Sequence, residues 1–177
     1  MLTDRHLPAP ELRAAELDGE VYRLDDCFCP VDEAAGIGHR AVALRSIAPE
    51  GLIAEQLTAA WVHGALPSPP ARHQFCADIR ARVRPTHPGR MSVREVVIQE
   101  HEIERIGPLR VTTPLRTVVD LLRFSPVFEA AEGAIVRELM TRERLEAADC
   151  AAALMERRNL PGKREALARL ERLLGDG

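Results

Sequence analysis

The chain has 177 residues, of which 46% are hydrophobic but only 3% aromatic, and its formal net charge is −3 at pH 7. This length supports one domain, or a small lobe beside a larger one, with a core of aliphatic side chains. The net charge provides no global attraction to nucleic acid, and no apolar run approaches the roughly eighteen residues of a membrane-spanning helix. We therefore expect a cytoplasmic protein without a membrane partner, whose four cysteines are free thiols.

Residues 1–33 form an acidic segment in which nine carboxylates oppose three arginines, a balance of −6. Residues 10–17 are compatible with a short helix, and residues 19–31 have the pattern of a hairpin with Asp25 and Asp26 near its turn. Cys27 and Cys29 lie on one strand without a second close ligand pair, so we expect no metal site. The segment predicts a helix followed by an acidic hairpin.

The middle of the chain predicts a small, mainly antiparallel sheet. Residues 39–47 and 55–63 have helical patterns, and Gly64 suits the end of the second helix. Between residues 73 and 84 apolar and polar side chains alternate, as in a half-buried strand with charges on its outer face. Further strands are predicted at residues 52–54, 93–99, 102–106 and 109–112.

Arginines dominate residues 72–94, where six of them stand against Asp78 alone, a local balance of +5. A phosphate backbone or an acidic partner protein could bind to such a local positive field. The alternative is the solvated face of an edge strand, where positive charge discourages aggregation. A third possibility is that the acidic amino-terminal segment neutralises the field, within one chain or in a dimer. The six residues are Arg72, Arg80, Arg82, Arg84, Arg90 and Arg94.

The segment LRVTTPLRTVVDLLRF, residues 109–124, joins a predicted strand directly to a predicted helix. Thr113 can cap the helix and Pro114 suits its first position. An apolar stripe begins at Leu115 and recurs at i+3, i+4 and i+7. Arg116 and Asp120 lie off this stripe at a spacing that favours an ion pair. Such a pair could be an anchor for an anion or a partner, or a structural pair that fixes the helix against the sheet; we favour the second.

This segment resembles the TTPxRTxxDLxR signature of actinobacterial antitoxin-like proteins of the type IV toxin–antitoxin class, the AbiEi family. The upstream block LTAAWVHG, residues 57–64, resembles the SAAxxHG segment of the same family. Order and spacing agree over residues 19–174. The positions that carry the resemblance, which we interpret as structural, are His63, Gly64, Thr112, Thr113, Pro114, Arg116, Thr117 and Asp120.

The resemblance implies a function in regulation. In that family a winged helix represses transcription of its own operon, and the remaining domain helps to counter a nucleotidyltransferase-like toxin. Here residues 1–33 would be a truncated, wing-like hairpin region, and residues 34–177 an antitoxin-like α+β domain. Many relatives continue into a restriction-endonuclease-like domain, which we expect to be absent because the sequence stops at Gly177.

After residue 125 the pattern becomes helical and predicts a C-terminal hairpin or bundle over residues 126–175. The predicted inward stripes are Phe128, Ala131, Ile135 and Leu139, then Leu145, Ala148, Ala152 and Met155, and finally Leu167, Leu170 and Leu174.

We therefore expect an α+β regulatory or interaction protein without catalytic residues or a cofactor, because no nucleophile elbow, P-loop or zinc-protease motif occurs. Its partner would be a nucleotidyltransferase-like toxin, another protein or DNA. Two alternatives stay open. One is a degenerate restriction-endonuclease-like nuclease, and the other is an interaction module that does not bind DNA.

Overall fold

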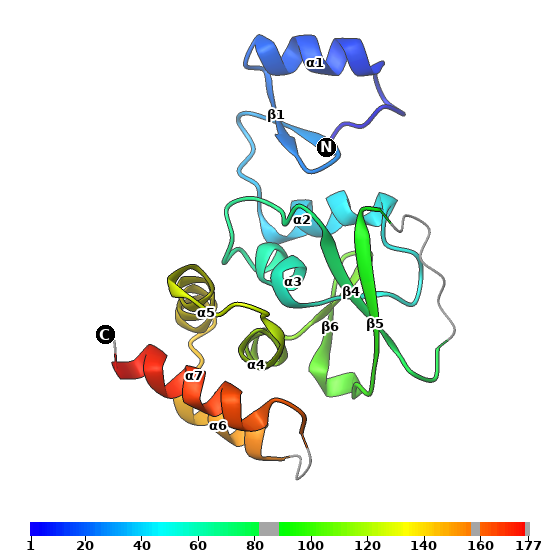
Figure 1. Cartoon of the computed structure of the whole chain (residues 1–177). Coiled ribbons are helices and arrows are strands. Elements are labelled where there is room, and N and C mark those ends of the chain that lie inside the picture. The colour runs from blue at the N-terminus through cyan, green and yellow to red at the C-terminus, as the bar shows by residue number, and fades with distance from the viewer. Residues whose placement is uncertain (82–88, 157–159, 176–177) are drawn as a thin grey trace.

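The computed structural model describes residues 1–81, 89–156 and 160–175. The fold is α+β: a small N-terminal lobe, a five-stranded sheet with its helices, and a group of C-terminal helices follow one another along the chain (Figure 1). The predicted class and the predicted order of sheet, central helix and C-terminal helices are confirmed. None of the helices within the described ranges combines the length and the apolar composition needed to cross a bilayer.

The N-terminal lobe (residues 1–33) is a helix followed by a hairpin, as predicted. Leu24 faces Cys27 across a two-residue turn, and Asp25 adopts a positive φ of 56° there, which aspartate tolerates better than most residues. A single antiparallel bridge joins Leu2 to Phe28. The elements of the lobe are α1 (Ala9–Leu17), β1 (Val21–Leu24) and β2 (Cys27–Pro30).

The central sheet has the strand order β5-β4-β3-β7-β6. Its middle strand, β3, is antiparallel to β4 and parallel to β7. The outer strands add a parallel pair, β4 with β5, and an antiparallel pair, β6 with β7. The strands are β3 (Ile53–Ala54), β4 (His73–Asp78), β5 (Met91–Val96), β6 (Ile103–Ile106) and β7 (Leu109–Thr112).

This sheet is more mixed than predicted, because it contains two antiparallel and two parallel strand pairs. Antiparallel pairs are in the majority only if the separate N-terminal hairpin is added. The difference arises after β4, which ends at Asp78 instead of continuing to residue 84. β5 is parallel to β4, so that the first residues of the two strands, His73 and Met91, lie side by side. A parallel pair needs a long connection, whereas two strands joined by a tight turn would have formed an antiparallel hairpin. The sequence also predicts a turn at residues 85–89, of which residues 85–88 lie outside the described residues.

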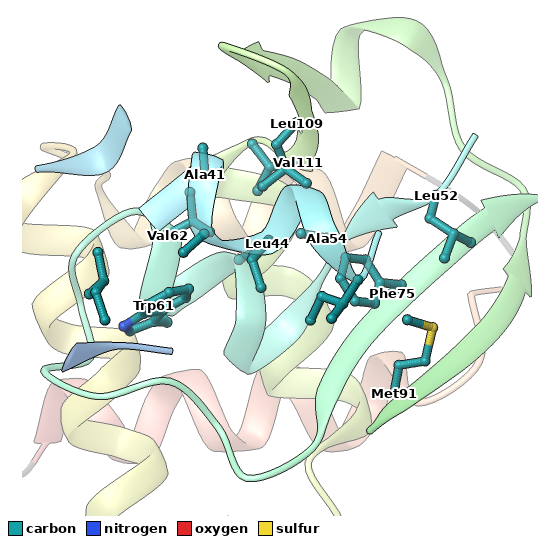
Figure 2. Close-up of a cluster of buried hydrophobic side chains, with 14 of the residues drawn as sticks. Ala41, Leu44, Leu52, Ala54, Trp61, Val62, Phe75, Met91, Leu109 and Val111 are labelled. Carbon is teal, nitrogen blue, oxygen red and sulfur yellow. The ribbon is translucent and has the colours of Figure 1, made fainter. Parts of the chain in front are cut away.

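One hydrophobic core lies between the sheet and the two helices that precede β4 (Figure 2). Trp61, Phe75 and Leu44 are fully buried there, and Met91 is nearly so. Cys27 and Cys29 of the hairpin belong to the same cluster, so the N-terminal lobe shares this core. The helices are α2 (Ile37–Ala43), which continues into the 3-10 helix η1 (Leu44–Ser46), and α3 (Gln56–Val62).

A second core surrounds the central helix α4, which packs against α3 and all three C-terminal helices. Val118 and Leu122 of the predicted stripe are fully buried in it. The helices that build this core are α4 (Pro114–Phe124), α5 (Ala130–Arg142), α6 (Ala147–Glu156) and α7 (Lys163–Gly175).

The predicted stripes of the C-terminal helices are wrong in part. In α6 the buried residues are Cys150 and Leu154, while Met155 is 60% exposed. The predicted stripe was counted from Leu145, but the helix begins only at Ala147, so Leu145 does not define which side of α6 faces inward. In α7 the inward face includes the buried Arg169, a residue that a purely hydrophobic pattern assigns to the outside.

Candidate functional site

The helix start predicted from Thr113 and Pro114 is present. The Thr113 hydroxyl accepts a hydrogen bond from the Arg116 backbone N–H at 3.4 Å, and Pro114 occupies the first turn. The Thr117 hydroxyl donates to the Thr113 carbonyl at 2.9 Å and lies 2.7 Å from the hydroxyl of Thr112. The three threonines therefore join β7 to α4 by side-chain hydrogen bonds as well as by the chain itself.

His63 connects the two sequence blocks that carry the family resemblance. It ends α3, is 3% exposed, and its Nε2 lies 2.9 Å from the Thr112 carbonyl. Because a carbonyl only accepts, Nε2 carries a proton, and Nδ1 faces the Glu104 carboxylate at 3.5 Å. The next residue, Gly64, has a φ of +89°, and the Arg142 guanidinium lies 3.4 Å from the position of an added Cβ. This block is thus a structural link between α3 and β7.

A buried charge cluster lies between α4 and the sheet, and Asp120 is its centre. The Asp120 carboxylate is fully buried and receives the Arg116 Nε at 2.9 Å and an Arg123 guanidinium nitrogen at 3.2 Å. A third guanidinium, from Arg94 on β5, lies 3.6 Å away. The predicted ion pair is therefore present, within a larger network.

Two further carboxylates complete the charge cluster. Glu55, which follows β3 directly, is 1% exposed and accepts two hydrogen bonds from Arg94 at 2.7 and 2.6 Å. Glu102 lies 2.8 Å from the second guanidinium nitrogen of Arg116. Three carboxylates thus balance three guanidiniums. Balance of this kind is what permits charges to be buried, since each unpaired ion would cost several kcal/mol.

The electrostatics of the charge cluster follow from its burial. Burial raises the pKa of Asp120 above its ordinary value, and Arg116 acts against that shift. Burial is the largest influence on Arg116 and acts to lower its pKa, but the Asp120 and Glu102 carboxylates together outweigh it, and the pKa ends above its ordinary value. The neighbouring Cys76 thiol has a raised pKa because it is buried and, second, because Glu55 is near. The carboxylate and the guanidinium stabilise each other where water is excluded.

A small cavity of about 90 Å³ between the start of α4 and α6 reaches the charge cluster, with Thr113 and Arg116 in its lining. Arg116 is only 7% exposed, and both Asp120 and Glu102 already hold it. An incoming anion would have to displace these carboxylates. The structural interpretation of Arg116 thus has geometric support, whereas an anion anchor would require a broken network.

The four arginines of the predicted field that the structure describes have different partners. Arg94 points into the charge cluster, and the Arg72 Nε donates to the Met91 carbonyl at 3.1 Å. Arg80 is exposed beyond the end of β4, where its N–H donates to the Asp78 carboxylate at 2.9 Å in a turn. That turn ends the strand and breaks the predicted alternation. Arg82 and Arg84 lie outside the described residues.

The acidic hairpin turn neutralises Arg90, which was one of the possibilities open from the sequence. The Arg90 guanidinium forms ion pairs with both Asp25 and Asp26. Asp25, whose side chain is only 8% exposed, also lies 3.2 Å from Nε2 of the buried His73. The N-terminal lobe is therefore fastened to the sheet by opposite charges within one chain.

All four cysteines are buried free thiols: Cys27, Cys29, Cys76 and Cys150. Burial raises the pKa of Cys27 to about 11, with Asp25 as the next contribution. No group of three His, Cys, Asp or Glu side chains able to hold a metal ion occurs among the residues that the structure describes.

Sequence reasoning missed Glu55 and Glu102 as members of the charge cluster and did not place Arg94 there. Glu55 and Arg94 are 39 residues apart, so no local spacing connects them. The one available signal was the position of Glu55, a carboxylate directly after the apolar run of β3.

No protein-family model matches the chain, and neither does any curated protein. Among solved structures, the chain is similar to the crystal structure of the RV2827C protein from Mycobacterium tuberculosis, with a TM-score of 0.51 and 18% sequence identity. The similarity covers 95% of this chain and 64% of that protein. At this level of identity the likeness shows a common fold alone.

Proposed function

We propose that this chain is a non-enzymatic, antitoxin-like regulatory protein of the cytoplasm that acts by binding another macromolecule. The observation that carries the proposal is the balanced charge cluster around the buried Asp120. Its central ion pair, Arg116 with Asp120, is buried, and each side chain neutralises the charge of the other. The pair holds α4 against the sheet. Arg116 and Asp120 therefore support a rigid binding scaffold. Catalytic side chains, in contrast, would have to exchange hydrogen-bond partners during a reaction.

The partner that the family resemblance favours is a nucleotidyltransferase-like toxin. A role in transcription is the second candidate, because α1 is followed by a hairpin that Leu2 extends by one bridge, an arrangement like a helix and its wing. Against it stands the charge of the lobe, since carboxylates facing a phosphate backbone repel it.

The test is co-expression of the tagged chain with the product of an adjacent nucleotidyltransferase-like gene, followed by co-purification and a toxicity assay. We expect a stable complex or relief of toxicity, either of which supports the proposal. A shift of duplex DNA from the chain's own promoter, abolished by salt, would favour the transcriptional role. Metal-dependent cleavage of plasmid DNA by the purified chain would refute the proposal and revive the nuclease alternative.

A further inference from the structure

A cleft of about 750 Å³ opens between the N-terminal lobe and the body of the protein. One wall is formed by α1 and the hairpin, and the other by Val42 and Arg45 at α2 and η1. Figure 1 shows the lobe standing above α2, with the hairpin between α1 and the body. The ion pairs of Asp25 and Asp26 with Arg90 hold the hairpin side of the cleft against the sheet, so the cleft has a defined shape.

The floor of the cleft is apolar and partly uncovered. Leu12 and Cys27 lie at its base and are almost fully buried, while Phe28 is half-buried. Val42 faces the cleft with 43% of its surface exposed. Phenylalanine and arginine are enriched in protein–protein interfaces, and this lining contains both.

The rim of the cleft has surplus positive charge. Arg5, Arg13 and Arg45 are exposed, and within the described residues no carboxylate pairs with any of them. Four arginines and three carboxylates line the cleft in all. Asp26 pairs with Arg90, which lies outside the cleft, and also with Arg23, so three arginines of the lining remain against two carboxylates, Asp4 and Glu16.

We propose that this cleft binds an acidic peptide segment with apolar side chains, supplied by a partner protein. The inference rests on the proposed function and names the surface through which recognition takes place. An apolar floor beside unpaired arginines complements a segment that carries leucine or phenylalanine flanked by glutamate or aspartate. A nucleic acid fits less well, because its phosphates repeat along the chain and would meet Asp4 and Glu16 on the same lining.

The test uses fluorescence anisotropy with a labelled peptide in which glutamates flank a leucine and a phenylalanine. A matched peptide carries glutamine in place of every glutamate, and a duplex DNA of random sequence is the third probe. The cleft variant is Arg13→Gln/Arg45→Gln. Its control, Arg137→Gln/Arg164→Gln, removes the same charge from exposed positions on α5 and α7.

We expect the acidic peptide to bind the wild-type chain and the control variant, and to bind the cleft variant about tenfold more weakly. The glutamine peptide should bind weakly to all three proteins. Absence of binding at low salt, or equal binding to the cleft variant, would overturn the inference. Stronger binding of DNA with the same dependence on Arg13 and Arg45 would also overturn it, in favour of a nucleic-acid site.

Failure here is distinguishable from failure of the proposed function. If the chain binds its partner protein while cross-links map to another surface, the cleft inference falls and the regulatory proposal stands. If the chain cleaves nucleic acid, the regulatory proposal falls whatever the peptide does.

Discussion

Replacing Asp120 by asparagine tests the charge cluster, because the substitution keeps the shape of the side chain and removes only its charge. Three guanidiniums lie within 3.6 Å of this fully buried carboxylate. Without it, Arg94 and Arg116 retain Glu55 and Glu102, but one positive charge is left without a balancing charge. Removing one partner of a buried pair costs about 3–5 kcal/mol of stability. Because two carboxylates remain in the cluster, we expect the cost of Asp120→Asn to lie near the lower end of this range.

A loss of about 3 kcal/mol corresponds to a fall in Tm of roughly 6–12 °C for a domain of this size. Urea unfolding followed by circular dichroism measures the free energy, and a thermal scan measures Tm. The matched control is Glu138→Gln, because Glu138 pairs with Arg142 on the surface of α5, where both side chains are about half exposed. That control should cost less than about 0.5 kcal/mol. A cost below about 1 kcal/mol for Asp120→Asn would refute the idea that these charges hold α4 to the sheet.

Three further changes test other parts of the structure. Gly64→Ala should destabilise the fold by roughly 1–2 kcal/mol in urea unfolding, because Gly64 has a φ of +89°; an unchanged midpoint would contradict the observed backbone. Asp25→Asn keeps a residue that tolerates the positive φ of the turn but removes the charge facing Arg90, so hydrogen exchange of the hairpin amides should accelerate while α4 stays protected; equal protection would show that the fastening is not ionic. Burial raises the pKa of the Cys27 and Cys150 thiols from 9.0 to about 11. Their contribution to stability is therefore complete below about pH 9 and is lost as pH rises toward 11, which unfolding at a series of pH values detects; a flat profile would argue against buried thiols.

The central helix could be predicted from the sequence because every determinant is local. Thr113 caps it, Pro114 starts it, and the Arg116–Asp120 pair is one helical turn apart. The hairpin was predictable for the same reason, since its alternation and its Asp25-Asp26 turn lie within a dozen residues.

The rest of the candidate site depends on tertiary structure. Glu55 and Arg94 meet only because β3 and β5 belong to one sheet, in which β5 is parallel to β4, whereas the sequence predicted a mainly antiparallel sheet. His63 and Thr112 meet across 49 residues. In α7 the buried Arg169 donates to the Leu122 carbonyl at 2.9 Å, a polar contact that a hydrophobic pattern cannot show.

The most direct measurement compares binding and stability in the double variant Arg116→Met/Asp120→Leu, which exchanges the central ion pair for apolar side chains of similar size. Buried pairs can often be replaced in this way without loss of the fold. We expect the variant to be folded and to bind the wild-type protein's probe or partner with a Kd within about threefold of wild type. A folded variant with an unchanged Tm whose binding is weaker by tenfold or more would show that Arg116 and Asp120 take part in recognition, and would contradict their assignment as a scaffold.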